Sequence, residues 1–263
     1  MNIIRIISVY FIITIYLLSA GDDIYQEIRV LHADPNTLQS LNNLGIPLDH
    51  VKKNKDGSLN LVVTMDEAHT LLKIGITFDV LQHDLTEYFV TRSTPGIERD
   101  FPLGSMLGNY TLLQAEAQMD TLRNMYPDFV SQKDSIGATI EGRTIWAFKV
   151  SDNPSIDEDE PEVLYTGLTH AREPLSMMNL FYFIRWLCEN YSSDVTAGFL
   201  VDHREMWFIP IINPDGYAYN ETIAPNGGGM HRKNRRPHPT ESCDHQGVDL
   251  NRNYSYNWGA NNS

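Results

Sequence analysis

Hydrophobic and polar residues follow two different rhythms along the chain, and the rhythm changes near residue 86. Before that point, short runs rich in Val and Leu alternate with polar segments that have helical spacing. We predict strands at 24–31, near 50–51, at 59–65 and at 78–81, with helices at 36–44 and 66–72. Asp66 is the expected cap of the second helix. The order β-α-β-β-α-β is that of a small ferredoxin-like α+β domain.

The second rhythm begins near Tyr110, where longer helical patterns alternate with apolar strands. Thr111 and Gln114 form the capping box of a helix that is expected to end at Tyr126. Further strands are predicted at 131–136, 143–150, 163–167 and 205–212, and a second helix at 174–190. Strands that alternate with helices indicate an α/β domain with a mixed sheet.

These patterns divide the chain into four parts: a signal peptide at 1–20, a small domain at 21–85, a linker at 86–108 and an α/β domain at 109–263. The linker is predicted because periodicity is lost there and turn-forming Pro and Gly residues appear. A processing protease cutting in this segment and a plain interdomain hinge are both compatible with it.

The first twenty residues have the layout of a secretory signal. Arg5 precedes an apolar run from Ile6 to Leu18, and the small residues Ser19 and Ala20 follow. An uncleaved membrane anchor is the alternative, but the run is short for a membrane span. We therefore expect a secreted, extracellular protein without stable membrane association after signal cleavage.

Composition narrows the classes of partner. The formal net charge is −14, and such an acidic surface repels phosphate backbones, so we expect no nucleic acid partner.

The sequence has two cysteines, Cys188 and Cys243, and whether they form a disulfide stays open. Cys188 lies in an apolar helical pattern and is expected to be a buried thiol.

The strongest local chemical signal is the segment 169–173, Thr-His-Ala-Arg-Glu, which joins a predicted strand to a predicted helix. Ligands in open α/β sheets gather beyond the carboxyl ends of the strands. His170 and Glu173 there can converge on one cation, and zinc accepts both imidazole nitrogen and carboxylate oxygen. Taken alone, the pair is better explained by helix capping or by a mutual hydrogen bond than by a metal ion.

Three further segments are ambiguous when taken singly. Residues 213–217, Asn-Pro-Asp-Gly-Tyr, follow a strand and have the composition of a turn. The run 231–236 is basic in an otherwise acidic chain and is compatible with a solvated charged surface. Residues 247–253 place Asp, Asn and Arg together, and an Arg beside an amide suits a carboxylate ligand.

In this order and spacing, the segments resemble the zinc metallocarboxypeptidases of the carboxypeptidase A and B type. The resemblance extends to residues 135–137 and 141–145, and it covers Tyr110 to the last residue. The region 24–85 is similar in layout to the activation domain of that family. The resemblance implies a mixed-sheet α/β/α carboxypeptidase-like domain, incomplete here, behind an activation domain, and the activity of a secreted hydrolase made as a zymogen.

The resemblance also implies the site. His170 and Glu173 match two ligands of a catalytic Zn²⁺ ion, and Asp249 matches the carboxylate that orients the first histidine. Arg232 matches the catalytic arginine that polarises the scissile carbonyl and stabilises the oxyanion.

The substrate-binding positions follow from the same resemblance. Asn251 and Arg252 match the pair that holds the free C-terminal carboxylate of a peptide or protein substrate, and Arg172 matches a residue that contacts the substrate further from its end. Water activated by zinc and a glutamate base would then attack the last peptide bond.

The family also uses a third zinc-binding histidine, a tyrosine and that glutamate base, and none has a match in this sequence. His203, His231, His238 and His245 lie outside the matching context. We therefore expect a fragment of a longer metalloprotease, or a truncated product, with weak zinc binding and no activity of its own. An inactive secreted module that binds peptide C-termini is the alternative function. A zinc deacylase of N-acyl amino acids is disfavoured by the activation-like domain.

Overall fold

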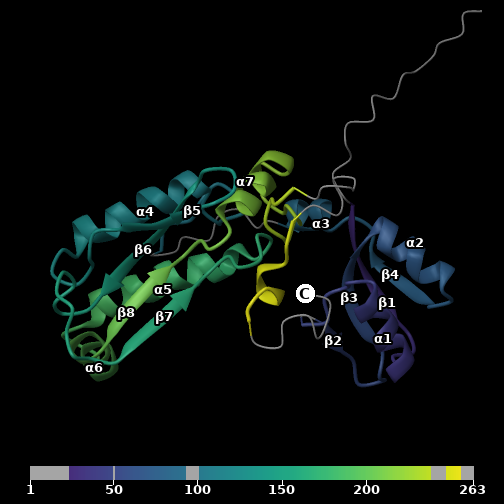
Figure 1. The fold of residues 1–263 in the computed structure, drawn as a ribbon, viewed down its shortest axis with the longest axis horizontal. Coiled ribbons are helices and arrows are strands. Elements are labelled where there is room, and N and C mark those ends of the chain that lie inside the picture. Colours follow the sequence, from purple (N-terminus) through teal and green to yellow (C-terminus); the bar gives the residue numbers. More distant parts are fainter. Residues whose placement is uncertain (1–23, 50, 93–100, 238–246, 256–263) are drawn as a thin grey trace, which may run out of the picture.

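A computed structural model of the chain describes residues 24–49, 51–92, 101–237 and 247–255. It contains two sheets, each with its own helices, and Figure 1 shows them as two units along the long axis of the molecule. The proposed signal segment and Cys243 lie outside the described residues. Among the helices of the described ranges, none combines the length and the apolar character that a membrane crossing requires.

The N-terminal unit, residues 24–92, is the predicted ferredoxin-like domain. Its strands are β1 (Tyr25–Val30), β2 (Lys52–Lys53), β3 (Leu59–Thr64) and β4 (Phe78–Gln82). Its helices are α1 (Pro35–Asn43), α2 (Met65–Lys73) and α3 (Leu85–Arg92). The sheet order is β2-β3-β1-β4 and every neighbouring pair is antiparallel, which confirms the predicted topology.

The cap of α2 differs from the prediction. The hydroxyl of Thr64 accepts from the backbone N–H of Glu67 at 3.1 Å, and the Glu67 carboxylate accepts from the N–H of Thr64 at 2.7 Å. This reciprocal capping box places Asp66 inside the first turn, where its charge complements the helix dipole instead of capping.

The start of the predicted linker is helical. Asp84 accepts from the N–H of Glu87 at 3.0 Å, and α3 follows immediately. This helix contacts the second unit, because the Thr86 hydroxyl donates to the carbonyl of Gly228 at 3.1 Å. This contact with the second unit therefore stabilises α3, although the sequence pattern of its residues only weakly predicts a helix. The rest of the predicted linker up to residue 100 lies outside the described ranges.

The C-terminal unit, residues 101–255, carries the second sheet. Its strands are β5 (Asp134–Ala138), β6 (Thr144–Val150), β7 (Glu162–Thr166) and β8 (Glu205–Ile209). Its helices are α4 (Leu112–Met125), α5 (Pro174–Asn190), α6 (Val195–His203) and α7 (Pro214–Ile223). The order is β5-β6-β8-β7, with β7 and β8 parallel and the other pairs antiparallel. The predicted mixed sheet is confirmed, as is the Thr111 capping box of α4.

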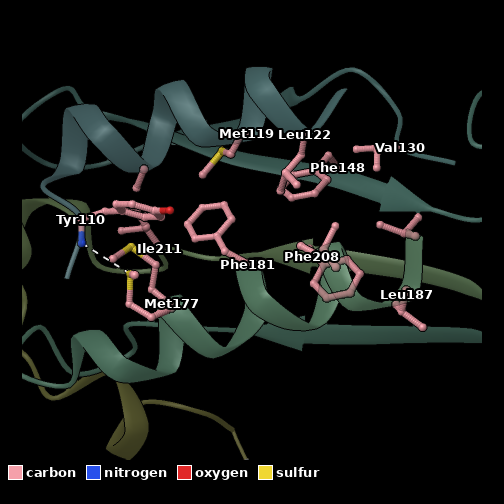
Figure 2. Close-up of a cluster of buried hydrophobic side chains, with 14 of the residues drawn as sticks. Tyr110, Met119, Leu122, Val130, Phe148, Met177, Phe181, Leu187, Phe208 and Ile211 are labelled. Atoms are coloured by element: carbon pink, nitrogen blue, oxygen red, sulfur yellow. Dashed lines mark hydrogen bonds between the residues drawn. The ribbon is translucent and has the colours of Figure 1, made fainter. Parts of the chain in front are cut away.

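One buried cluster joins α4, α5 and the sheet (Figure 2). Phe148 and Phe208 face each other across β6 and β8 with their ring centroids 5.9 Å apart. Leu122 of α4 and Phe181 of α5 are fully buried in the same cluster. Cys188 lies there as well, and burial raises the pKa of its thiol to about 12, so the predicted buried thiol is confirmed.

Residues 213–216 begin helix α7, whereas their composition predicted a turn. Asn213 caps the helix by accepting from the N–H of Gly216 at 3.1 Å, and Pro214 occupies its first turn. Asp215 is 3% exposed and accepts from the Thr139 hydroxyl at 2.7 Å. The Asn213 cap and Pro214 are local signals that a turn shares, whereas the contact between Asp215 and Thr139 spans 76 positions and leaves no local signature. Helix α6, capped by Asp194, was likewise not predicted.

Candidate metal centre and carboxylate-binding site

The site begins where the chain leaves β7. Leu168 is buried and has a φ of 49°, a left-handed conformation that is strained for a bulky residue by about 1–2 kcal/mol. Its N–H donates to the Ser176 hydroxyl at 2.9 Å, and its carbonyl accepts from the N–H of Asn213 at 3.2 Å. Helix α5 and the start of α7 therefore hold the strained turn that directs the chain into His170.

His170 lies between two carboxylates. Its Nδ1 atom is 3.0 Å and 3.2 Å from the two oxygens of Glu173, and its Nε2 atom is 3.1 Å from Oδ1 of Asp249. The imidazole is 3% exposed. Glu173 precedes α5 without a capping hydrogen bond from its side chain, so the helix-capping alternative does not apply in this structure, whereas the mutual hydrogen bond of the other alternative is present.

The charges around His170 stabilise its protonated form. Burial alone would lower its pKa, but the hydrogen bonds to Asp249 and Glu173 outweigh burial and raise the pKa. Burial also opposes ionisation of Asp249, yet the hydrogen bond to His170 and the charge of Arg232 hold the pKa of this carboxyl well below its usual range. Asp249 therefore stays an anion, able to hold the Nε2 proton of a neutral His170.

These residues fit a zinc ion. Asp249 holds the Nε2 proton, so when His170 loses its Nδ1 proton and becomes neutral, the Nδ1 lone pair faces the Glu173 carboxylate. Two ligands of one tetrahedral zinc ion are about 3.4 Å apart, so the observed 3.0–3.2 Å needs a shift of only tenths of an ångström. Imidazole nitrogen and carboxylate oxygen are ordinary zinc ligands.

Arg232 lies beside this pair and is 5% exposed, so this member of the basic run is not part of a solvated surface. Its Nε donates to Oδ2 of Asp249 at 2.9 Å. Its Nη1 atom is 3.7 Å from Glu173 Oε1, is buried, and has no hydrogen-bond acceptor among the described residues. Arg232 thus presents one guanidinium nitrogen toward the Glu173 carboxylate without a hydrogen bond to it.

A carboxylate from the N-terminal unit occupies the remaining side of Arg232. Oδ2 of Asp49 accepts from Nη2 of Arg232 at 2.9 Å and lies 3.1 Å from Nη2 of Arg252. The Asp49 side chain is 24% exposed. Arg252 comes from the segment 247–255, drawn in yellow between the two units in Figure 1. The guanidinium groups of Arg232 and Arg252 thus hold the Asp49 carboxylate next to the His170–Glu173 pair.

The other two predicted substrate-binding residues, Arg172 and Asn251, make contacts with other groups than Asp49. Arg172 lies over the ring of Tyr25, with 5.7 Å from its guanidinium carbon to the ring centroid, and burial lowers its pKa. Asn251 is exposed, and its backbone N–H donates to Oδ1 of Asp249 at 2.9 Å. The structure thus brings His170, Glu173, Asp249, Arg232 and Arg252 together, while Arg172 faces the N-terminal unit.

Asn220 is a site residue that the sequence did not indicate. It is 2% exposed, and its Nδ2 donates to the carbonyls of Ala171 at 3.0 Å and His231 at 2.9 Å. Its Oδ1 accepts from the N–H of His231 at 2.8 Å. The N–H of Ala171 also donates to the carbonyl of Arg232 at 3.0 Å. The side-chain amide of Asn220 therefore joins the loop that carries His170 and Glu173 to the segment that carries Arg232.

Comparison with known proteins identifies the family of the chain. A sequence model of the family described as zinc carboxypeptidase matches residues 115–263. A zinc carboxypeptidase of Saccharothrix mutabilis subsp. capreolus is 38% identical over 162 residues, which cover 62% of this chain and 36% of that protein. Metallocarboxypeptidase A of Trichophyton tonsurans is 36% identical over 122 residues, covering 46% and 27%. The chain thus spans about a third of the length of these relatives.

Solved structures show the same fold. The chain superposes on the thrombin activatable fibrinolysis inhibitor with a TM-score of 0.65 and 22% identity, covering 90% of this chain and 60% of that one. It superposes on carboxypeptidase A from Helicoverpa armigera with a TM-score of 0.67 and 21% identity, covering 90% and 59%. Since the family model matches more than half of its residues, this chain belongs to the zinc carboxypeptidase family.

Proposed function

We propose that the protein to which this chain belongs is a zinc-dependent metallocarboxypeptidase that removes C-terminal residues from peptides and proteins. The observation that carries the proposal is the position of the Asp49 carboxylate between Arg232 and Arg252, at 2.9 Å and 3.1 Å, beside the His170–Glu173 pair. A free peptide C-terminus carries the same chemical group. The guanidinium of Arg252 is suited to recognise this group, and the adjacent guanidinium of Arg232 then lies near the carbonyl of the last peptide bond, beside the metal ligands.

The residues at the metal pair have separate tasks in this proposal. His170 and Glu173 hold Zn²⁺, and Asp249 fixes the ring orientation of His170 through Nε2. Bound there, the ion supplies a Lewis acid for a carbonyl oxygen and lowers the pKa of water. Arg232 presents its buried Nη1 as a hydrogen-bond donor for the carbonyl oxygen on which negative charge develops.

The remaining arginines position the substrate. Arg252, with Asn251 beside it in the chain, takes the C-terminal carboxylate. Arg172 stacks against the Tyr25 ring and takes a part of the peptide further from its end. A peptide can reach these groups only when Asp49 and Tyr25 have moved away, since both occupy their surroundings in this structure.

The N-terminal unit is therefore proposed to be an activation domain, and the protein a zymogen. Residues 21–85 form the domain, 86–108 connect it to the catalytic domain at 109–263, and residues 1–20 serve as a secretory signal. The polar contacts of Asp49 and Tyr25 with three site arginines support this proposal. Secretion as an extracellular enzyme follows from the same signal.

The test is release of the C-terminal amino acid from a synthetic peptide, with the C-terminally amidated peptide as the matched substrate. From the complete protein to which this chain belongs, we expect chelator-sensitive release from the free peptide only, after the N-terminal unit has been removed by limited proteolysis; residues 1–263 alone should release no amino acid. Replacement of Arg252 by Met should raise KM for the free peptide by at least about tenfold, because one guanidinium partner of the carboxylate is lost. Equal release from both peptides would contradict the proposal.

An inactive module that binds peptide C-termini is the second candidate, favoured by the same pair of arginines. That function would be supported if the protein bound the free peptide more tightly than the amidated peptide and released no amino acid from either. Absence of both binding and release would exclude both candidates.

A further inference from the structure

Arg232 and Arg252, which hold the Asp49 carboxylate together, come from two different segments of the chain. Arg232 belongs to residues 231–237, which form neither helix nor strand. Arg252 belongs to residues 247–253, where the only regular element is the short 3₁₀-helix Leu250–Arg252. Regular secondary structure therefore does not fix the distance between the two guanidinium groups, and this distance depends on individual contacts between the segments.

Asn234 makes the contacts that join the two segments. Its N–H donates to the carbonyl of Val248 at 3.1 Å. Its side-chain oxygen Oδ1 accepts from the N–H of Val248 at 2.7 Å and from the N–H of Arg236 at 3.2 Å. One side-chain oxygen thus bonds two N–H groups that belong to different segments, 12 positions apart in the chain.

The backbones of the two segments touch at this point. The N–H of Gly247 donates to the carbonyl of Arg236 at 2.8 Å. Gly247 has a φ of 94°, and a Cβ atom on it would clash with the carbonyl oxygen of Asn234. The chain therefore has a glycine where the backbone of Asn234 lies against the second segment.

The contact with Val248 extends directly into the site. The next residue, Asp249, accepts from Nε of Arg232 at 2.9 Å and lies 3.1 Å from Nε2 of His170. The carbonyl of Asp249 accepts from the N–H of Arg252 at 3.0 Å. The position of Val248 thus determines where Asp249 and Arg252 lie relative to Arg232.

We propose that Asn234 is a positioning residue of the carboxylate site, and that its side-chain oxygen sets the spacing between Arg232 and Arg252. The inference rests on the proposed function, because it concerns the same two arginines. Both partners of Oδ1 are backbone N–H groups, and Nδ2 of Asn234 donates to no described residue. The position therefore needs an acceptor oxygen and not an amide.

The test compares Asn234→Ala with Asn234→Asp in the full chain that also carries Asp49→Asn, which removes the competing carboxylate. Fluorescence titration with a synthetic peptide that has a free C-terminus, and with its C-terminally amidated form, gives the ratio of the two affinities. Asn234→Ala should lower this ratio at least about tenfold, because the two guanidinium groups no longer face one peptide end together. Asn234→Asp keeps an acceptor oxygen at the same place and should restore most of the ratio.

Asn124→Ala, at an exposed position of α4, is the matched control and should keep the ratio of the parent chain. The affinity for the amidated peptide and the unfolding temperature are measured for every variant, since a general loss of structure would lower both. A positioning role requires that the ratio falls in an Asn234→Ala chain that is still folded. Complete unfolding of this variant would show a role in folding instead and overturn the assignment.

Two other results would also overturn the positioning role and leave the proposed function standing. One is an equal ratio in Asn234→Ala and Asn124→Ala, and the other is an Asn234→Asp chain that discriminates no better than Asn234→Ala. A parent chain that binds the free and the amidated peptide equally would overturn the carboxylate site itself, and with it both proposals. None of these measurements depends on peptidase activity.

Discussion

Single buried polar residues determine how the site is assembled. His231 shows this at the position next to Arg232, since Asn220 holds both its N–H and its carbonyl, and its ring Nε2 lies 3.3 Å from the carbonyl of Asn234. Burial first, and then the charge of Arg235, lower the pKa of His231 to about 4. The folded chain therefore requires a neutral imidazole at this position.

This requirement gives a pH-dependent stability. An unfolded histidine has a pKa of about 6.5, so His231 contributes its full stability above that pH and loses it as the pH falls toward 4. Between pH 7 and pH 4.5, the unfolding free energy of the wild type should fall by about 2 kcal/mol more than that of His231→Gln. Denaturant titrations at several pH values measure the difference. His69→Gln, at an exposed position on α2, is the control, and parallel curves for wild type and His231→Gln would contradict the prediction.

The closeness of His170 and Glu173 could be predicted from sequence because both lie in one short segment that follows the end of β7. The structure brings His170, Glu173, Asp249 and Arg232 within contact distance of one another, as the resemblance implied. Asp49 and Asn220 could not be predicted. Asp49 is 183 positions from its partner Arg232, and Asn220 bonds to Ala171 across 49 positions. Pairings at such separations leave no periodic pattern.

At the scale of elements, helix α7 is packed tightly against the site through Gly216. A Cβ atom on this residue would lie 2.5 Å from the carbonyl oxygen of Lys233 and 2.8 Å from Cβ of Ala171. Both neighbours belong to segments that carry site residues, so the helix, the metal loop and the arginine segment must meet here without a side chain.

Gly216→Ala should therefore destabilise the fold by about 2–4 kcal/mol through overpacking. Gly137→Ala is the matched control, because nothing lies within 4 Å of its added Cβ. It should change the unfolding free energy by less than about 1 kcal/mol. Thermal or denaturant unfolding measures both variants, and equal effects would show that the close approach does not constrain α7.

Elements with strong local signals were predicted well, whereas α7 was not. The capping box of Thr111 and Gln114 marks α4 in the sequence and is present in the structure. The Asn-Pro-Asp-Gly start of α7 is compatible with a turn and with a capped helix, and the distant contacts of Asp215 with Thr139 and Arg143 favour the helix. The α2 cap fell on Thr64 instead of Asp66 because the reciprocal box with Glu67 satisfies two backbone N–H groups at once.

At the scale of the whole molecule, charge pairs join the two units across the site. Asp49 meets Arg232 and Arg252, and Tyr25 lies over Arg172. Asp49→Asn should weaken this association, because an amide cannot balance two guanidinium groups. We expect peptides with a free C-terminus to bind about tenfold more tightly to the variant than to the wild type.

Fluorescence titration with free and amidated peptides measures this change. Asp79→Asn, an exposed aspartate on β4 of the same unit, is the matched control and should bind as the wild type does. If Asp49→Asn bound the free peptide no better than Asp79→Asn, the N-terminal unit would not be competing for the carboxylate position.

The most direct measurement is the anomalous X-ray signal at the zinc absorption edge, from crystals of the chain grown with zinc. We expect a peak between Nδ1 of His170 and the carboxylate of Glu173, about 2.0–2.2 Å from each ligand atom, and no such peak in His170→Ala. The assignment of this pair as metal ligands would be contradicted if zinc peaks appeared only at other positions while His170 stayed hydrogen-bonded to Glu173.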